Sequence, residues 1–475
     1  MSWDPIVRHH QDRRRQFLLR SSSGLGAAAL ASLLPGSASA MAADGLHFLA
    51  KAKNVIHIFL SGGPSQMDLF DPKPKLNELN GQEIPKSVVG MQRLTTMTRE
   101  QSSFPLAGSQ FQFQKCGESG LELSELLPKL ATVADKLTVI RSMHTEPINH
   151  DPAVTFLQTG SSITGRPCLG SWVSYGLGTE NTDLPAFIVL LSVGGPGGQP
   201  VLSKYWHSGF LPGQYQGAQF RSQGEAVIDL ADPDGISRED RRRIVTAIND
   251  LNRLKLQSTF DPDIEARINA FELAFRMQTS VPDLMSVGGE PQHILELYGA
   301  EPGKASFANN CLLARRLIER GVRFVQLYDK DWDHHGDLPR KLRKKTQETD
   351  QAMAALLRDL DQRGLLEDTL VICGGEFGRT AYTQGQLTVD NYGRDHHPRC
   401  FTMWLAGGGI KPGLVIGKTD DFSYNIVEDP VHVHDLQATI LHCLGIDHER
   451  LTYRFQGRDF RLTDVHGRLI TQVLT

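Results

Sequence analysis

Residues 54–63 read NVIHIFLSGG, in which seven mostly apolar residues lead directly into a Ser-Gly-Gly turn. A short apolar run that ends at glycines is typical of a buried strand. Helical patterns occupy residues 307–319 and 340–362, between further apolar runs. This alternation predicts an α/β fold with a mostly parallel sheet sandwiched by helices. The further runs are residues 137–140, 322–328, 369–373 and 400–406.

Polar side chains cluster where several of these predicted strands end. The clusters lie at residues 61–68, 149–151 and 331–335, and at Glu376 together with His396-His397. In parallel sheets, binding sites form at the carboxyl ends of the strands. Groups this far apart in the sequence meet only in a folded domain, and the usual reason to gather them is a metal-assisted active site.

The segment DWDHH, residues 331–335, combines carboxylates and imidazoles. Asp331 with His335, or Asp333 with His335, has a spacing that suits one divalent ion, and the mixed ligand set favours zinc or manganese. A solvated polar turn is the alternative. The pair His396-His397 precedes a predicted strand and is suited to supply one ligand and one supporting hydrogen-bond donor.

Two further segments carry candidate catalytic residues. Glu376 lies among glycines in GGEFGRT, where the backbone can approach a ligand and Arg379 is placed to hold an anion. The alternative is a glycine turn with a surface acid. Asn149 and His150 stand next to an aspartate, and such a group can ligate a metal, act as a base or bind an oxyanion.

The first forty residues have the order of a twin-arginine signal peptide. Arg13-Arg14-Arg15 precedes Gln-Phe-Leu, a modestly apolar stretch follows at residues 25–34, and Ala38-Ser39-Ala40 resembles a cleavage site. We therefore expect residues 1–40 to be removed and residues 41–475 to be exported to the periplasm or the cell surface. No later run of about 20 apolar residues follows, so we expect no stable membrane anchor.

The composition is that of a globular protein of 475 residues with a formal charge of −4. A mildly acidic chain without a basic stripe is not typical of nucleic-acid binding. Residues 165–300 differ from the rest, because they are rich in Gly, Pro and Gln up to about residue 225 and then helical over residues 238–278. We interpret them as an insertion or cap on one α/β domain that spans residues 41–475.

Several motifs together resemble an exported family, the domain of unknown function 1501, within the alkaline phosphatase and sulfatase superfamily. The resemblance covers nearly all of the chain after the leader and implies an alkaline phosphatase-like fold. The motifs are HIFLSGGPSQMDLFDPKP at residues 57–74, NHDPAVTFLQTG at 149–160, WDHHGDL at 332–338, GGEFGRT at 374–380 and GRDHHP at 393–398.

The superfamily binds two metal ions about 4 Å apart. The resemblance implies that one ligand set survives as Asp333 (or Asp331), His335 and His396. The second set departs from the family pattern, because its first carboxylate falls on Ser61. Asp68 is a substitute for that carboxylate in this interpretation. The Asp-His pair of the second set falls on Glu376-Phe377.

The position of the superfamily's Ser, Thr or formylglycine nucleophile falls on His150. A standard sulfatase mechanism is therefore not expected. The first hypothesis is an exported hydrolase of phosphate or sulfate esters, small molecules or glycans, that uses water activated by one or two zinc, manganese or calcium ions. Arg379 or Arg394 would neutralise the anion. The alternative is a catalytically inactive exported module that binds anionic glycans or serves in assembly.

Overall fold

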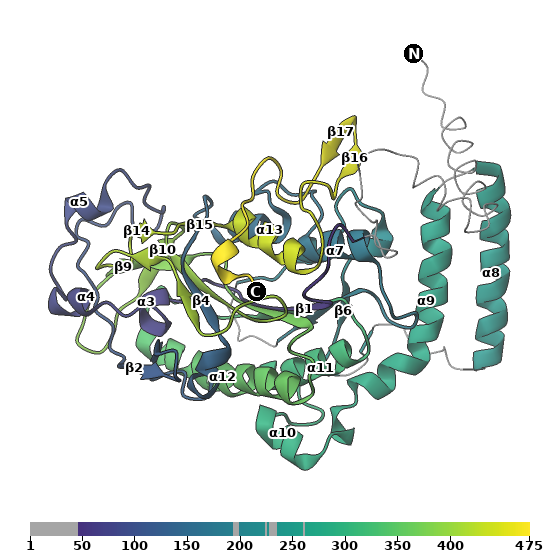
Figure 1. Ribbon diagram of the computed structural model, residues 1–475, viewed down its shortest axis with the longest axis horizontal. Coiled ribbons are helices and arrows are strands. Elements are labelled where there is room, and N and C mark those ends of the chain that lie inside the picture. The colour runs from purple at the N-terminus through teal and green to yellow at the C-terminus, as the bar shows by residue number, and fades with distance from the viewer. Residues whose placement is uncertain (1–45, 193–198, 224–225, 228–234, 260–261) are drawn as a thin grey trace. The chain divides into compact units, whose positions relative to one another are not determined.

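A computed structural model describes residues 46–192, 199–223, 226–227, 235–259 and 262–475 (Figure 1). The predicted signal peptide lies outside the described residues. Within them, nine strands form one sheet in the order β12-β4-β11-β8-β1-β7-β5-β6, with β15 paired to β4. Their bounds are β1 Asn54–Leu60, β4 Thr138–His144, β5 Phe187–Leu191, β6 Ala218–Phe220, β7 Phe324–Asp329, β8 Thr369–Gly374, β11 Phe401–Gly407, β12 Leu414–Ile416 and β15 Val431–His432.

The centre of this sheet is parallel. β1 pairs in parallel with β7 on one side and β8 on the other, and β5 and β6 continue the parallel order. β11 is the exception, because it runs antiparallel to both β8 and β4. The predicted α/β class with a mostly parallel sheet is confirmed.

Helices cover both faces of the sheet, as Figure 1 shows for α11 (Phe307–Glu319) and α12 (Leu338–Gln362) on one side and α13 (Val433–Cys443) on the other. Alternate residues of β1 explain the two layers. Ile56 and Ile58 belong to the apolar cluster that contains α11 and α12, whereas Val55 belongs to the cluster that contains α7 (Leu169–Leu177) and α13. Burial of apolar surface on both faces therefore holds the sheet between two helical layers.

Residues 165–300, predicted to be an insertion, supply two strands of the sheet and two long helices outside it. Strands β5 and β6 from this region pair within the sheet. The helical pattern at residues 238–278 forms two helices that pack on each other, α8 (Arg238–Thr259) and α9 (Pro262–Met285). The division into a main domain and a cap stays a prediction.

The remaining helices and strands of the described chain are short. They are α3 Gln66–Leu69, α4 Pro74–Glu78, α5 Lys86–Val89, α6 His150–Thr159, α10 Gln292–Tyr298, β2 Phe113–Cys116, β3 Leu121–Ser124, β9 Gly378–Thr383, β10 Arg394–His397, β13 Lys418–Thr419, β14 Ile426–Glu428, β16 Tyr453–Phe455 and β17 Arg458–Phe460.

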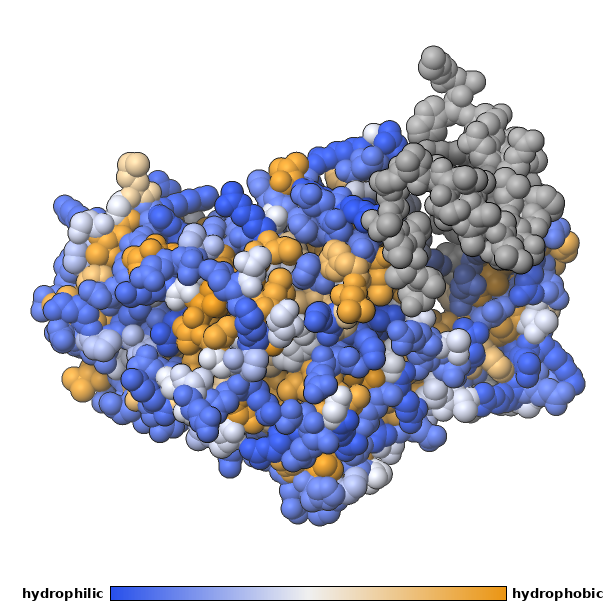
Figure 2. All heavy atoms as spheres, in the orientation of Figure 1, coloured by the Kyte–Doolittle hydropathy of each residue, from blue (hydrophilic) through white to orange (hydrophobic). Residues whose placement is uncertain are grey.

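The face of the described chain that Figure 2 shows is largely polar. Figure 2 shows hydrophilic residues over most of the visible face, with the apolar residues in separate patches. Among the described residues, none of the helices combines the length and hydropathy needed to cross a membrane.

The strand ends that carry the polar segments lie side by side. In the sheet register, Leu60 of β1 is opposite Asp329 of β7, and Phe59 is opposite Gly374 of β8. Beyond β8 the chain forms β9, which pairs antiparallel with β10 and places His396 opposite Arg379. Segments that are far apart in the sequence therefore meet at one edge of the sheet.

Candidate metal centre

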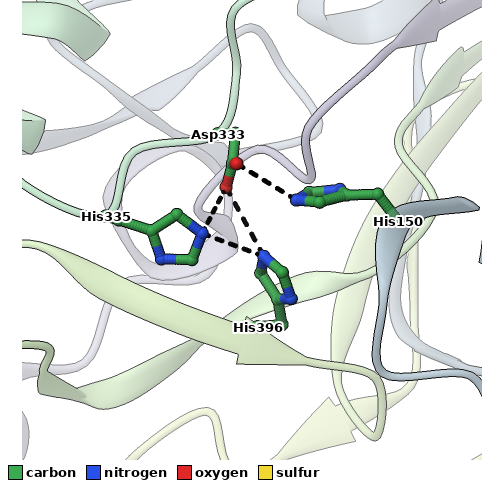
Figure 3. A group of neighbouring side chains, drawn as sticks. All are labelled: His150, Asp333, His335 and His396. Carbon is green, nitrogen blue, oxygen red and sulfur yellow. Dashed lines mark hydrogen bonds and ion pairs between the residues drawn. The ribbon is translucent and has the colours of Figure 1, made fainter. Parts of the chain in front are cut away.

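Four side chains from three segments converge at this edge (Figure 3). His150 is the first residue of α6, Asp333 and His335 lie in the loop after β7, and His396 lies in β10. One ligand atom from each of the four residues lies within 4.8 Å of every other. In the part of the chain that the structure describes, this is the one such group of histidine, cysteine and carboxylate side chains.

The distances within this group suit a tetrahedral ion. The Nε2 atom of His335 lies 2.8 Å from Asp333 Oδ1 and that of His396 lies 3.5 Å from the same oxygen. His150 Nε2 lies 3.2 Å from Asp333 Oδ2. The Nε2 atoms of His335 and His396 are 3.0 Å apart. Zinc bonds of about 2.0–2.1 Å in a tetrahedron imply about 3.3 Å between neighbouring ligand atoms.

The other ring nitrogen of each histidine fixes where its proton lies. His150 Nδ1 contacts Glu376 Oε1 at 2.5 Å, and His396 Nδ1 contacts the Ile148 carbonyl oxygen at 2.9 Å. His335 Nδ1 contacts Gln384 Oε1. Carboxylate, carbonyl and amide oxygens only accept, so each Nδ1 donates, and the Nε2 of each neutral ring then carries a lone pair.

This proton arrangement is typical of histidines that ligate a metal. With all three rings neutral, three Nε2 lone pairs face one carboxylate, which is unfavourable unless a metal ion or an additional proton lies among them. The lone pairs of His335 and His396 cannot form a hydrogen bond with each other. The donor set and its spacing therefore fit one divalent ion of the zinc type.

The surroundings keep Asp333 ionised and His396 neutral, which are the forms in which these side chains bind a metal. Burial opposes ionisation of Asp333, but the charge of the Arg379 guanidinium beside it holds the pKa of its carboxyl well below the ordinary range. Burial lowers the pKa of His396 to about 4. For His150, hydrogen bonds to Asp333 and Glu376 outweigh the effect of burial and raise the pKa. A metal at this site would have to displace any proton on His150, so its binding is expected to be pH-dependent.

Arg379, predicted to hold an anion, is buried and contacts other parts of the protein. Its side chain is 1% exposed, and it donates to Asp333 Oδ1 at 2.5 Å and to the Gly63 carbonyl oxygen at 2.8 Å. It also donates to the carbonyl oxygens of Gly62 and Arg394. These contacts place the Arg379 guanidinium against Asp333, the carboxylate of the candidate centre.

Arg394 is also unavailable as a ligand for a substrate anion. Its side chain is fully buried and pairs with Asp68 Oδ2 at 2.8 Å. The Asp68 carboxylate also accepts hydrogen bonds from Ser65 at 2.5 Å and Tyr392 at 2.8 Å. Asp68, expected to substitute for a metal ligand, is instead part of a buried ion pair that joins α3 to β10.

The remaining predicted metal residues lie outside the ligating group. Glu376 accepts a hydrogen bond from the Gly62 amide at 3.0 Å and another from His150 Nδ1. Its carboxylate is therefore a hydrogen-bond partner of a candidate ligand. His397 Nε2 contacts the Tyr424 carbonyl oxygen at 2.8 Å. Asp331 is not a member of the group, so the loop after β7 contributes Asp333 rather than Asp331.

The predicted second metal position has no ligand group among the described residues. Phe377, where the sequence resemblance implied the loss of an imidazole, packs its ring against His150 and His396 at centroid distances of 4.9 and 4.6 Å. An aromatic ring at this place supports the orientation of the imidazoles and provides no ligand atom.

Sequence patterns gave no indication of two glutamines at the centre. Gln384 accepts from His335, and Gln199 donates to Asp333 Oδ2 at 2.9 Å. Both lie in loops, without a motif around them that signals a site. Only the folded contacts show that they orient ligands.

A pocket of about 550 Å³ adjoins the centre, with His396 in its wall. Asn149, predicted to be catalytic, lines this pocket and precedes α6. A molecule bound in the pocket would therefore lie beside the candidate metal ligands. The other lining residues are Gln92, Arg93, Thr95, Thr145, Glu146, Pro147, Ile148, Pro152, Ser162, Tyr382, His397, Pro398, Arg399 and Tyr424.

The fold and the site together define an α/β protein with a candidate metal centre at the carboxyl ends of its central strands. The chain belongs to the family described as Protein of unknown function (DUF1501), whose model matches residues 52–474. The predicted family is thereby confirmed. A search of the curated proteins found no match.

Solved structures similar to this chain include a sulfatase, a phosphonate monoester hydrolase and an alkaline phosphatase. The PsFucS1 sulfatase from Pseudoalteromonas sp. has a TM-score of 0.35 and 11% identity, over 84% of this chain and 68% of that one. The phosphonate monoester hydrolase SpPMH from Silicibacter pomeroyi has a TM-score of 0.31 and 10% identity, over 83% and 73%. Alkaline phosphatase from the Antarctic bacterium TAB5 has a TM-score of 0.31 and 11% identity, over 78% and 94%.

Proposed function

We propose that this protein is an exported hydrolase of phosphate or sulfate esters that uses one divalent metal ion to activate water. The observation that carries the proposal is the set of three imidazole Nε2 lone pairs directed at the Asp333 carboxylate. A divalent ion held by such a set would make water a nucleophile near neutral pH and polarise an ester oxygen.

The chain's own residues would hold and orient this centre. Glu376 and the Ile148 carbonyl fix two of the imidazoles, and Arg379 fixes the carboxylate. His150 stands where the family resemblance places a nucleophile, but its two nitrogens face Glu376 and Asp333. Water is therefore the nucleophile that this arrangement favours.

A second function is favoured by the number of ligands. Four protein ligands complete a tetrahedron, whereas catalytic zinc sites usually keep one position open. The same geometry would suit a binding module for anionic glycans in which the metal stabilises the fold. Partial exposure of His335, whose side chain is 24% exposed, favours the hydrolase, because it leaves one side of the centre open.

Turnover of 4-nitrophenyl phosphate and 4-nitrophenyl sulfate tests the proposal. We expect the purified protein to hydrolyse at least one ester, to lose activity on chelation and to regain it when zinc or manganese is added. His396→Ala should be inactive, and His293→Ala, an exposed histidine on α10, should keep full activity. A protein that holds its metal without any turnover would favour the binding module, and activity that survives in metal-free protein would contradict both.

The proposed export rests on the Arg-Arg-x-Phe-Leu pattern at residues 14–18. We expect replacement of Arg14 and Arg15 by Lys to retain the precursor in the cytoplasm, because the twin-arginine route requires this pair. Cell fractionation of the wild-type and variant chains measures the outcome. Equal amounts of both in the periplasmic or surface fraction would overturn this part of the proposal.

A further inference from the structure

We infer that the pocket beside His396 binds a second anionic group of the ligand through Arg93 and Arg399. The ligand class would then be a molecule that carries more than one sulfate or phosphate group. This inference deepens the proposed function, since one ester group would lie at the metal centre and another in the pocket.

Arg93 extends from a segment in which side chains on both sides of it are held by hydrogen bonds. Gln92 Nε2 donates to Asn425 Oδ1 at 3.0 Å. On the other side, Thr98 donates to the buried Asp395 at 2.6 Å, and Thr95 donates to the same carboxylate. Arg93 itself is exposed, lines the pocket and has no ion-pair partner among the described residues.

Arg399 lies in the connection between β10 and β11, where its neighbours in the chain are also held in place. The Thr145 amide donates to the Pro398 carbonyl oxygen at 2.9 Å, and Cys400 is fully buried. The Arg399 side chain is exposed between these fixed neighbours, and among the described residues it forms no ion pair. Both arginines are therefore positioned by the fold while their guanidinium groups remain available.

The acidic residue in the same pocket contacts a histidine and forms no ion pair with either arginine among the described residues. Glu146 Oε1 lies 2.8 Å from His432 Nε2. Arg379 and Arg394, by contrast, are both buried and paired with carboxylates. Two arginines without carboxylate partners in one concave site attract anions, and the planar guanidinium matches sulfate and phosphate oxygens with two hydrogen bonds.

Calorimetric titration with sucrose octasulfate, with neutral sucrose as the control ligand, tests this inference. We expect the wild-type protein to bind the octasulfate and not sucrose. A double variant with Arg93→Gln and Arg399→Gln should bind it at least tenfold more weakly. A control double variant, Arg243→Gln with Arg454→Gln, removes the same charge from exposed arginines on α8 and β16 and should bind like the wild type.

The same titration on His396→Ala separates this inference from the proposed function. Dependence on Arg93 and Arg399 that persists in that variant would support the pocket even if no ester is hydrolysed. No binding of the octasulfate by wild-type protein would overturn the inference. Equal weakening in the two double variants would also overturn it, because it would show attraction to the overall charge rather than to the pocket.

Discussion

The protonation of single ring nitrogens determines what the candidate centre can bind. In each of His150, His335 and His396, an oxygen acceptor holds the Nδ1 proton, and this leaves Nε2 for the metal. The chemistry therefore depends on residues that never contact the ion.

Glu376→Gln should weaken metal binding by about 10- to 100-fold, as changes to partners of metal-ligating histidines typically do. The neutral amide is a poorer acceptor for His150 Nδ1–H and no longer raises the basicity of the ring. Competition with a chromogenic chelator measures the affinity. Glu348→Gln, a partly exposed glutamate on α12, is the matched control, and equal affinities in the two variants would contradict the assigned role of Glu376.

His335→Ala should lose the metal, whereas His334→Ala should retain it. The two histidines are neighbours, but only His335 belongs to the ligating group. His334 Nε2 contacts the Asp331 carbonyl oxygen at 2.9 Å, and burial lowers its pKa to about 3. Elemental analysis after dialysis against buffer gives the stoichiometry. Metal retained by His335→Ala and lost from His334→Ala would reverse the assignment.

At the scale of elements, the loops after β1 and β7 must approach closely to form the centre. Gly62 has φ of +121°, and a Cβ there would lie 2.7 Å from the carbonyl carbon of Trp332. Its amide donates to Glu376 as well. A side chain at Gly62 would therefore displace the loop that carries Asp333.

Gly62→Ala should cost about 1–3 kcal/mol of stability and weaken metal binding at least tenfold. Gly81→Ala is the control, because Gly81 also has positive φ but has nothing within 4 Å of its Cβ position. The control should lose stability from backbone strain and keep its metal affinity. Urea unfolding and chelator competition on both variants separate strain from contact, and equal metal affinities would count against the close approach of the two loops.

The buried pair of Asp68 and Arg394 joins α3 to β10, the strand that carries His396. Arg394→Met should destabilise the fold by about 3–5 kcal/mol, because it leaves a carboxylate buried without its partner. Arg454→Met, which removes an exposed pair with Asp459, should cost at most about 1 kcal/mol. Urea denaturation measures both. Similar small losses would show that the buried pair does not hold β10 in place.

Sequence patterns predicted the elements well, because apolar periodicity reports burial. Residues 54–60 form β1, and the helical pattern at residues 307–319 coincides with α11. The direction of a strand could not be predicted in this way. The apolar run at residues 400–406 corresponds to β11, which is antiparallel to its neighbour β8. Apolar periodicity is the same in parallel and antiparallel strands that are buried on both faces, so it could not distinguish them.

The candidate site was predictable only in part, for a related reason. Motifs indicated Asp333, His335 and His396, and the structure places these residues together. The charge of Arg379 suggested a bound anion, but contacts with Gly63 and Asp333 bury it. A charged residue in a motif does not reveal its own partners, because those partners come from other segments of the fold.

At the scale of the whole molecule, buried histidines should make stability depend on pH. Burial lowers the pKa of His57, in β1, to about 4, against 6.5 in an unfolded chain. Above pH 6.5 both states keep His57 neutral. Between pH 6.5 and 4 only the unfolded chain binds the proton, so stability falls as the pH falls.

His57→Leu removes this contribution. The stability difference between wild type and variant should change by roughly 3 kcal/mol between pH 7 and pH 4, in the direction that makes the wild type relatively less stable in acid. Urea unfolding at a series of pH values measures it. A difference that stays constant across this range would mean that His57 takes up a proton in the folded protein.

The central claim is that His150, Asp333, His335 and His396 hold one divalent ion. Elemental mass spectrometry of the purified protein, after exposure to zinc, manganese and calcium and removal of free ions, tests it most directly. We predict about one ion per chain in the wild type and less than about a tenth of that in His396→Ala. A folded wild-type protein that retains no ion, or a variant that retains a full ion, would contradict the claim.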